Sequence, residues 1–167
     1  MLIYHPAFDM HHCVFRILLL LSEMPESVYE IDRIKILDFC LLFPYHLQQV
    51  TFPTNARSYR KALPHLNPYD KLEDPHRILH RLTPYQLTAL NCLASYNLID
   101  SELLSKGQVK RTNQKIPREL TIALEKAKQR DYGILSILIG PFALIDLYGP
   151  NGLKARTGLL EYKYDAV

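Results

Sequence analysis

Two segments near the amino terminus contain more apolar residues than one buried helix face requires. Residues 32–47, DRIKILDFCLLFPYHL, begin as an amphipathic helix, because Ile34 and Leu37 share one face while charged residues occupy the others. From Phe39 to Phe43 every residue is apolar. Seven of the eight residues in 14–21 are apolar as well. We therefore expect two helices that are apolar around most of their circumference.

Two arrangements would cover this apolar surface. Either the chain buries it in a deep core, or a second protein covers it. Burial of one Leu or Phe side chain contributes about 1.5–3 kcal/mol, so several uncovered residues would make the isolated chain poorly soluble. We favour an obligate subunit of a complex. The expected partner-binding residues come from both segments and are Phe15, Leu19, Phe39, Leu42, Phe43 and Tyr45.

The composition is typical of a folded protein without a membrane segment. Of the 167 residues, 48% are hydrophobic and 22% are charged, which excludes wholesale disorder. No apolar run reaches the roughly 20 residues that a membrane helix needs, and no positive charge precedes the first one, as a signal peptide would require. The three cysteines form no CxxC pair. We expect free thiols and a cytoplasmic location.

The element order predicts a mainly α fold with a small β component, in which a helical bundle is combined with a winged-helix-like module. Residues 1–50 are expected to form a helical hairpin, and 51–75 an irregular linker that prolines interrupt. Residues 76–167 are expected to form the winged-helix-like lobe, packed with the rest as one unit. Within this lobe we expect a helix beginning at Thr83, a strand in 108–112, a helix kinked at Pro141 and a hairpin in 153–165.

Candidate catalytic and metal-binding groups are weak. The run Asp9–Cys13, DMHHC, combines metal-ligating residue types, but adjacent helix residues point about 100° apart and cannot easily converge on one ion. His76 and His80 are four apart, yet the glutamate of a zinc-protease helix is missing. No nucleophile elbow and no phosphate-binding loop occurs. We expect no metal, no cofactor and no enzymatic activity.

A basic segment supports a different function. Residues 106–130 contain eight Lys or Arg against two Glu, a net charge of 8 − 2 = +6. This segment is either a solvated surface or a phosphate-binding one, and no side chains look arranged to read base edges. The alternative function is therefore a stand-alone winged-helix DNA-binding regulator. Its expected nucleic-acid-binding residues are Lys106, Lys110, Arg111, Lys115 and Arg118.

Motifs at both ends of the chain resemble a known family. The sequences YHPAFDMHHCVFRILLLL and YEIDRIKILDFCLLFPYHL, with GLKARTGLLEYKYD near the carboxy terminus, are similar to middle components of bacterial three-component ATPase conflict systems. The resemblance implies a non-catalytic subunit that joins an SMC-like ABC ATPase to an effector, often a nuclease. Such systems, of which Lamassu is an example, act against phages or plasmids. DNA contact would then occur through the complex.

Overall fold

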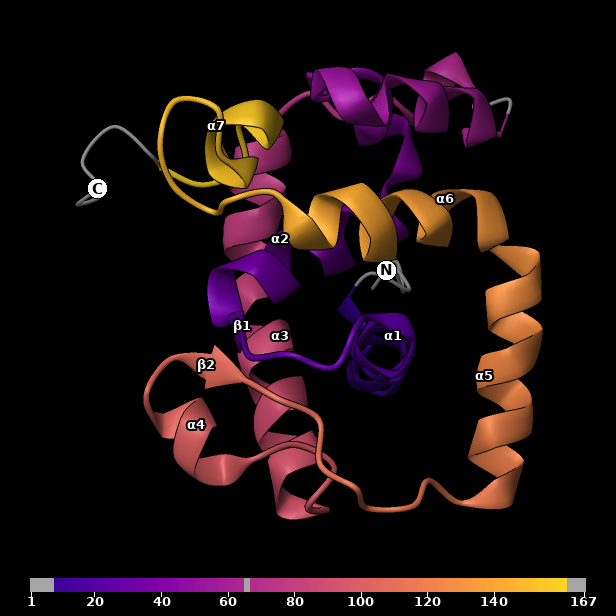
Figure 1. The fold of residues 1–167 in the computed structure, drawn as a ribbon, viewed down its shortest axis with the longest axis vertical. Helices are drawn as coiled ribbons and strands as arrows, with labels where there is room; N and C mark the ends of the chain where they lie inside the picture. The colour runs from indigo at the N-terminus through magenta and orange to yellow at the C-terminus, as the bar shows by residue number, and fades with distance from the viewer. Residues whose placement is uncertain (1–7, 65–66, 162–167) are drawn as a thin grey trace, which may run out of the picture.

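The structure, a computed structural model, describes residues 8–64 and 67–161, most of which are helical (Figure 1). This confirms the expected mainly α fold with a small β component. The first elements are α1 (Met10–Glu23), β1 (Tyr29–Glu30), α2 (Ile31–Leu42) and the 3-10 helices η2 (Pro44–Gln48), η3 (Thr54–Ala62) and η4 (Pro68–Asp70). They are followed by α3 (Pro75–Ser95), α4 (Ser101–Ser105), β2 (Gln108–Val109), α5 (Arg118–Arg130), α6 (Tyr132–Ile137), the π-helix η5 (Leu138–Phe142) and α7 (Leu153–Thr157).

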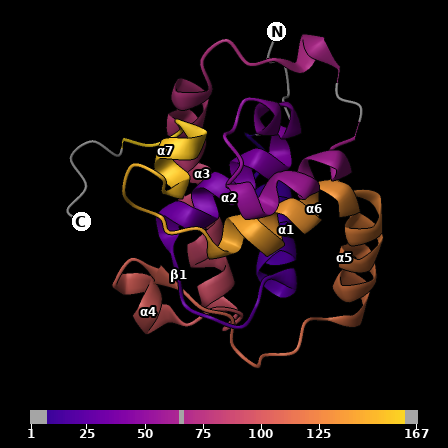
Figure 2. The ribbon, with the colours of Figure 1, turned by 45° about the horizontal axis from the view of Figure 1, so that its top comes forward.

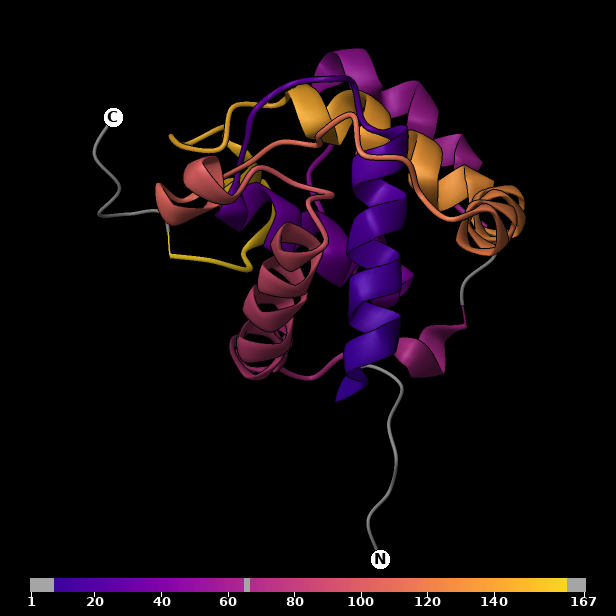
Figure 3. The same ribbon diagram turned by 90° about the horizontal axis from the view of Figure 1, so that it is seen from below.

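Helix α1 forms the centre of the core. It is seen end-on near the middle of Figure 1, and Figure 3 shows it running beside α3. Contacts with α2, α3, α5 and η5 reach it from different sides. Its residues 17–21 are all buried as a result. The helix begins where Asp9 accepts a hydrogen bond from the backbone N–H of His12, so the DMHHC run starts with a helix cap.

Helix α3 is longer than the sequence pattern predicts. It begins at Pro75, where Asp74 accepts a hydrogen bond from the N–H of Arg77, and not at Thr83. Pro84 lies inside the helix, although proline cannot donate the interior hydrogen bond. Buried residues on both sides of Pro84, such as Leu82 and Gln86, pack into the same core and outweigh this loss. The predicted start was wrong because tertiary packing overrides a local signal.

The strand pairing differs from that of a winged-helix module. The expected strand near Val109 exists as β2, but it pairs antiparallel with β1, with Tyr29 opposite Val109. Residues 153–157 form α7 instead of the first strand of the expected hairpin, so that part of the prediction is wrong. A helix places Leu153 and Thr157, four residues apart, on the same buried side, and Gly158 ends it at φ 63°, a left-handed conformation. The second expected strand lies mostly outside the described residues.

Residues 52–62 of the expected linker pack on the late part of the chain. Helix η3 contacts α6 so closely that a Cβ atom at Gly133 would collide with the carbonyl oxygen of Ala62. Nearby, the Phe52 and Phe142 rings lie 5.1 Å apart between centroids. This part of the expected linker therefore packs on α6 and η5, and Phe52 and Ala56 contribute to the core.

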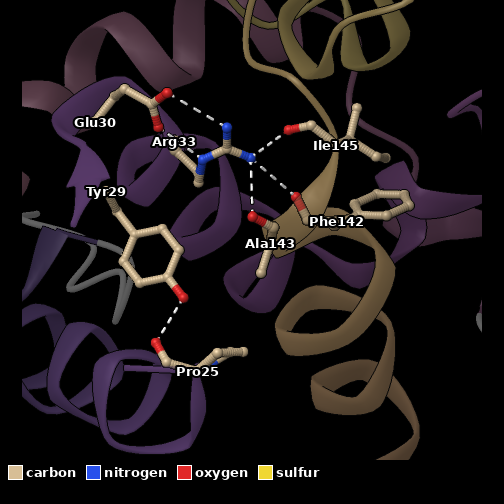
Figure 4. Close-up of polar contacts among 7 residues, drawn as sticks. All are labelled: Pro25, Tyr29, Glu30, Arg33, Phe142, Ala143 and Ile145. Atoms are coloured by element: carbon tan, nitrogen blue, oxygen red, sulfur yellow. Dashed lines mark hydrogen bonds and ion pairs between the residues drawn. The ribbon is translucent and has the colours of Figure 1, made fainter. Parts of the chain in front are cut away.

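A buried arginine binds the backbone between η5 and α7 through hydrogen bonds. The backbone of Gly140 is non-helical, at φ −89° and ψ −105°, which confirms a kink beside Pro141. The carbonyl oxygens of Phe142, Ala143 and Ile145 accept hydrogen bonds from Nη1 of Arg33 on α2 (Figure 4). The Nε of Arg33 donates to Glu30, 2.8 Å away. One side chain thus satisfies backbone carbonyl groups that have no helical donor where this helical segment ends.

Helix α7 packs on α2 (Figure 2), and a buried histidine fixes its end. Nε2 of His46 donates to the carbonyl oxygen of Thr157 at 2.8 Å, which identifies the tautomer because a carbonyl oxygen only accepts. Burial lowers the pKa of His46 below its ordinary value of 6.5, and the hydrogen bond to Thr157 offsets only part of this effect.

This environment makes the stability of the protein sensitive to pH. Because the folded-state pKa of His46 lies below the unfolded-state value of 6.5, the unfolded chain binds more protons as the pH falls through 6.5. We expect the free energy of unfolding to fall from pH 7.5 towards pH 5.5, measured by urea denaturation. The His46→Gln variant should lose this part of the pH dependence. Parallel pH profiles for the two proteins would contradict the prediction.

Candidate partner-binding surface

The carboxy-terminal end of α2 places three predicted partner-binding side chains together. Helix α2 ends where the N–H of Phe43 donates to the carbonyl oxygen of Phe39, and Pro44 then begins the tight turn of η2. Leu42, Phe43 and Tyr45 are consequently neither buried nor fully exposed. We call the half-buried residues Phe15, Leu42, Phe43 and Tyr45 the α2-end surface.

Two pockets flank Leu42 on this surface. One, of about 360 Å³, lies between residues 42–45 and residues 69–72 of η4 and the turn after it. The other, of about 260 Å³, is lined by Leu42 with Phe15, Arg16 and Arg130 among others. Four of the six residues predicted for partner binding are therefore brought to one region, and Leu42 belongs to both pockets.

Residues 69–72 were missed by the sequence analysis. Tyr69, at the rim of the larger pocket, is 94% exposed, and large apolar side chains are seldom left so open. Asn67 positions it by accepting a hydrogen bond from the N–H of Tyr69 at 3.1 Å. The sequence NPYD carries a recognisable turn signal, but only the fold places this turn beside η2.

Leu19 and Phe39 lie elsewhere, in the core. Their exposed fractions are 2% and 0%, and the Phe39 ring contacts Phe43 and His46 at centroid distances of 5.0 and 5.6 Å. This chain therefore covers both side chains itself. Their burial removes Leu19 and Phe39 from the predicted partner-binding set, since neither presents surface to another protein.

A buried ion pair supports the α2-end surface from beneath. Asp38 is fully buried and accepts hydrogen bonds from Nε of Arg16 on α1 and from Nε2 of Gln86 on α3, both at 2.8 Å. The three helices are thereby joined one turn before Leu42. A sequence signal for this contact existed, because Arg16 and Asp38 are opposite charges, each in or beside an apolar run.

The five basic residues predicted to bind nucleic acid are not equivalent. Lys106, Lys115 and Arg118 are exposed, whereas Lys110 and Arg111 are half-buried. Nη1 of Arg111 donates to the carbonyl oxygen of Leu98 at 2.8 Å, and burial lowers the pKa of this guanidinium. Arg111 therefore supports the loop backbone, while the three exposed side chains point their charge outward.

In ranges 8–64 and 67–161 no three His, Cys, Asp or Glu residues are grouped as metal ligands would be. The same ranges contain no helix with the length and apolar character to cross a bilayer.

The fold and this surface define a small helical protein with half-buried aromatic and aliphatic side chains around two adjoining pockets. The family model described as ABC-three component (ABC-3C) system Middle Component 5 matches residues 2–165, and the chain belongs to this family. It is thus a middle component of a three-component ABC system, as the resemblance of both chain ends predicted. Comparison with curated proteins and with solved structures gave no match.

Proposed function

We propose that this protein is a non-catalytic accessory subunit that joins an SMC-like ABC ATPase to an effector of nuclease type. The complex would act in the cytoplasm against phages or plasmids, as Lamassu-like systems do. Family membership over residues 2–165 carries the proposal, because a middle component of a multi-component system works with protein partners.

The α2-end surface supports docking of the ATPase. Half-buried Leu, Phe and Tyr side chains around pockets are typical of the central part of protein interfaces, where a few anchors supply most of the binding energy. Leu42 lines both pockets, so one element of a partner can occupy them together. The exposed ring of Tyr69 offers a further aromatic contact at the rim.

The double variant Leu42→Glu with Tyr45→Ala tests this assignment. We expect it to weaken binding to the co-encoded ATPase by about thirtyfold, corresponding to about 2 kcal/mol for loss of an anchor pair. Binding is measured by titration after co-purification, and thermal melting checks that the variant folds. Leu144→Glu is the matched control, because Leu144 is 73% exposed and lines neither pocket. Equal affinity of the folded double variant and wild type would refute the assignment.

The stand-alone winged-helix DNA-binding regulator is not the function we propose. Residues 153–157 are helical where that module needs a strand, and the guanidinium of Arg111 donates a hydrogen bond to the backbone carbonyl of Leu98. We expect contact with DNA only through the assembled complex.

A further inference from the structure

An apolar groove lies away from the α2-end surface. It has a volume of about 330 Å³ and forms where α1, the last turns of α3 and the beginning of α5 meet. Of the ten described residues that line it, all except Gln114 and Lys115 are apolar. We call it the α5 groove.

The described part of the chain leaves the groove open. Val14 on α1, Cys92 on α3 and Leu120 on α5 line it and are only half-buried, and Tyr96 at its edge is 70% exposed. Further along α5, Leu124 and Ala127 are buried. The apolar face of α5 is thus covered at its far end, while its first turn still presents apolar surface.

Positive charge without an acidic partner borders the same groove. Residues 106–118 contain five Lys or Arg and no Asp or Glu. Lys115 lines the groove and Arg118 begins α5, and neither takes part in an ion pair within the described residues. By contrast, Lys128 near the end of α5 is 3.0 Å from the Glu23 carboxylate. A complementary ligand therefore combines apolar side chains with carboxylates.

Two other occupants fit this chemistry poorly. The DNA backbone offers phosphates but no apolar face for a groove of this lining. A second copy of this chain docked symmetrically would bring two basic 106–118 segments together, and like charges at an interface are unfavourable.

We propose that the α5 groove binds an acidic amphipathic helix of a partner protein in the same complex. Apolar side chains at i and i+4 spacing enter the groove, and Asp or Glu residues beside them face Lys115 and Arg118. The inference rests on the proposed function and adds a second docking surface, which a subunit joining two proteins requires.

Cys92 provides a reporter within the groove. The other two cysteines, Cys13 and Cys40, are fully buried, and burial raises the pKa of the Cys13 thiol to about 12, so neither reacts readily with a thiol reagent. Alkylation by N-ethylmaleimide, followed by mass spectrometry of the intact full chain, therefore reports on Cys92. We expect alkylation at least about tenfold slower in the complex with the co-encoded ATPase and effector than in the free chain.

Two charge-reversal variants test whether the protection of Cys92 in the complex depends on the positive charge of Lys115. Lys115→Glu should restore the alkylation rate of Cys92 in the complex by about tenfold, because the carboxylates of the partner helix then face a like charge. Lys126→Glu is the control: this residue is exposed on α5 and does not line the groove, so Cys92 should stay protected. Both side chains are exposed, so neither variant threatens the fold.

The possible outcomes separate the two proposals. A complex that forms while Cys92 reacts as fast as in the free chain overturns the groove assignment and leaves the proposed function standing. A chain that binds neither co-encoded partner overturns both. Protection of Cys92 by duplex DNA alone, or by raising the concentration of this chain alone, identifies one of the rejected occupants and overturns the inference.

Discussion

Replacement of Arg33 by alanine is expected to lower the free energy of unfolding by about 3–5 kcal/mol. Arg33 is 6% exposed, and its Nη1 lies 3.3, 3.2 and 2.6 Å from the carbonyl oxygens of Phe142, Ala143 and Ile145. Truncation leaves these oxygens without their donor near the kink and leaves Glu30 without its ion pair. Unsatisfied buried polar groups cost more than the net worth of the bonds that they lose.

Urea denaturation of matched variants measures this effect. Arg33→Lys keeps the charge, but one ammonium group cannot reproduce the fork of a guanidinium, so we expect an intermediate loss. Arg57→Ala removes an exposed arginine and should change stability by no more than about 0.5 kcal/mol. A loss below about 1 kcal/mol for Arg33→Ala would contradict the prediction, because it would show that other groups satisfy these carbonyl oxygens.

The second large effect is expected at Asp38. The Asp38→Ala variant leaves Arg16, whose side chain is 12% exposed, as an uncompensated charge and removes an acceptor from Gln86. Breaking a buried ion pair from one side typically costs about 3–5 kcal/mol. The loss should be visible both in urea denaturation and in the thermal midpoint.

A double replacement separates the cost of breaking the pair from its net worth. Arg16→Met with Asp38→Leu removes both charges and keeps apolar volume, so we expect a smaller loss than for Asp38→Ala alone. The single variants Arg16→Met and Asp38→Leu complete a double-mutant cycle, which gives the coupling energy between the two side chains. If the double variant is less stable than Asp38→Ala, the ion pair contributes more to the free energy of unfolding than the uncompensated buried charge of Arg16 costs.

The apolar excess near the amino terminus is surface only in part: Leu19 and Phe39 are buried, whereas Phe15, Leu42, Phe43 and Tyr45 are half-buried. In the structure α1 is contacted by α2, α3, α5 and η5, so an all-round apolar helix is what this position requires. Leu19 on α1 is a core residue for this reason, and Phe39 on α2 is buried against Phe43 and His46. Of the six residues predicted for partner binding, Leu42, Phe43, Tyr45 and Phe15 stay half-buried near the end of α2.

Local signals and long-range contacts differed in how well they could be predicted. The cap at Asp9, the kink beside Pro141 and the strand at Val109 follow from residues within a few positions of one another. The partner of that strand, the helix in residues 153–157 and the pocket contributed by Tyr69 depend on segments far away in sequence. No spacing rule connects Arg33 with the carbonyl oxygens more than a hundred residues later.

The sequence alone determines three features of this protein: its helical class, its basic segment and its resemblance to a middle component of a three-component system. These features depend on composition, periodicity and motif. Only the tertiary structure decides which apolar side chains remain accessible: Phe39 is buried, whereas Leu120 is half-buried. Exposure is a property of a side chain's neighbours in space, and in this core α1 and α2 pack against α3 and η5, which are distant segments of the sequence.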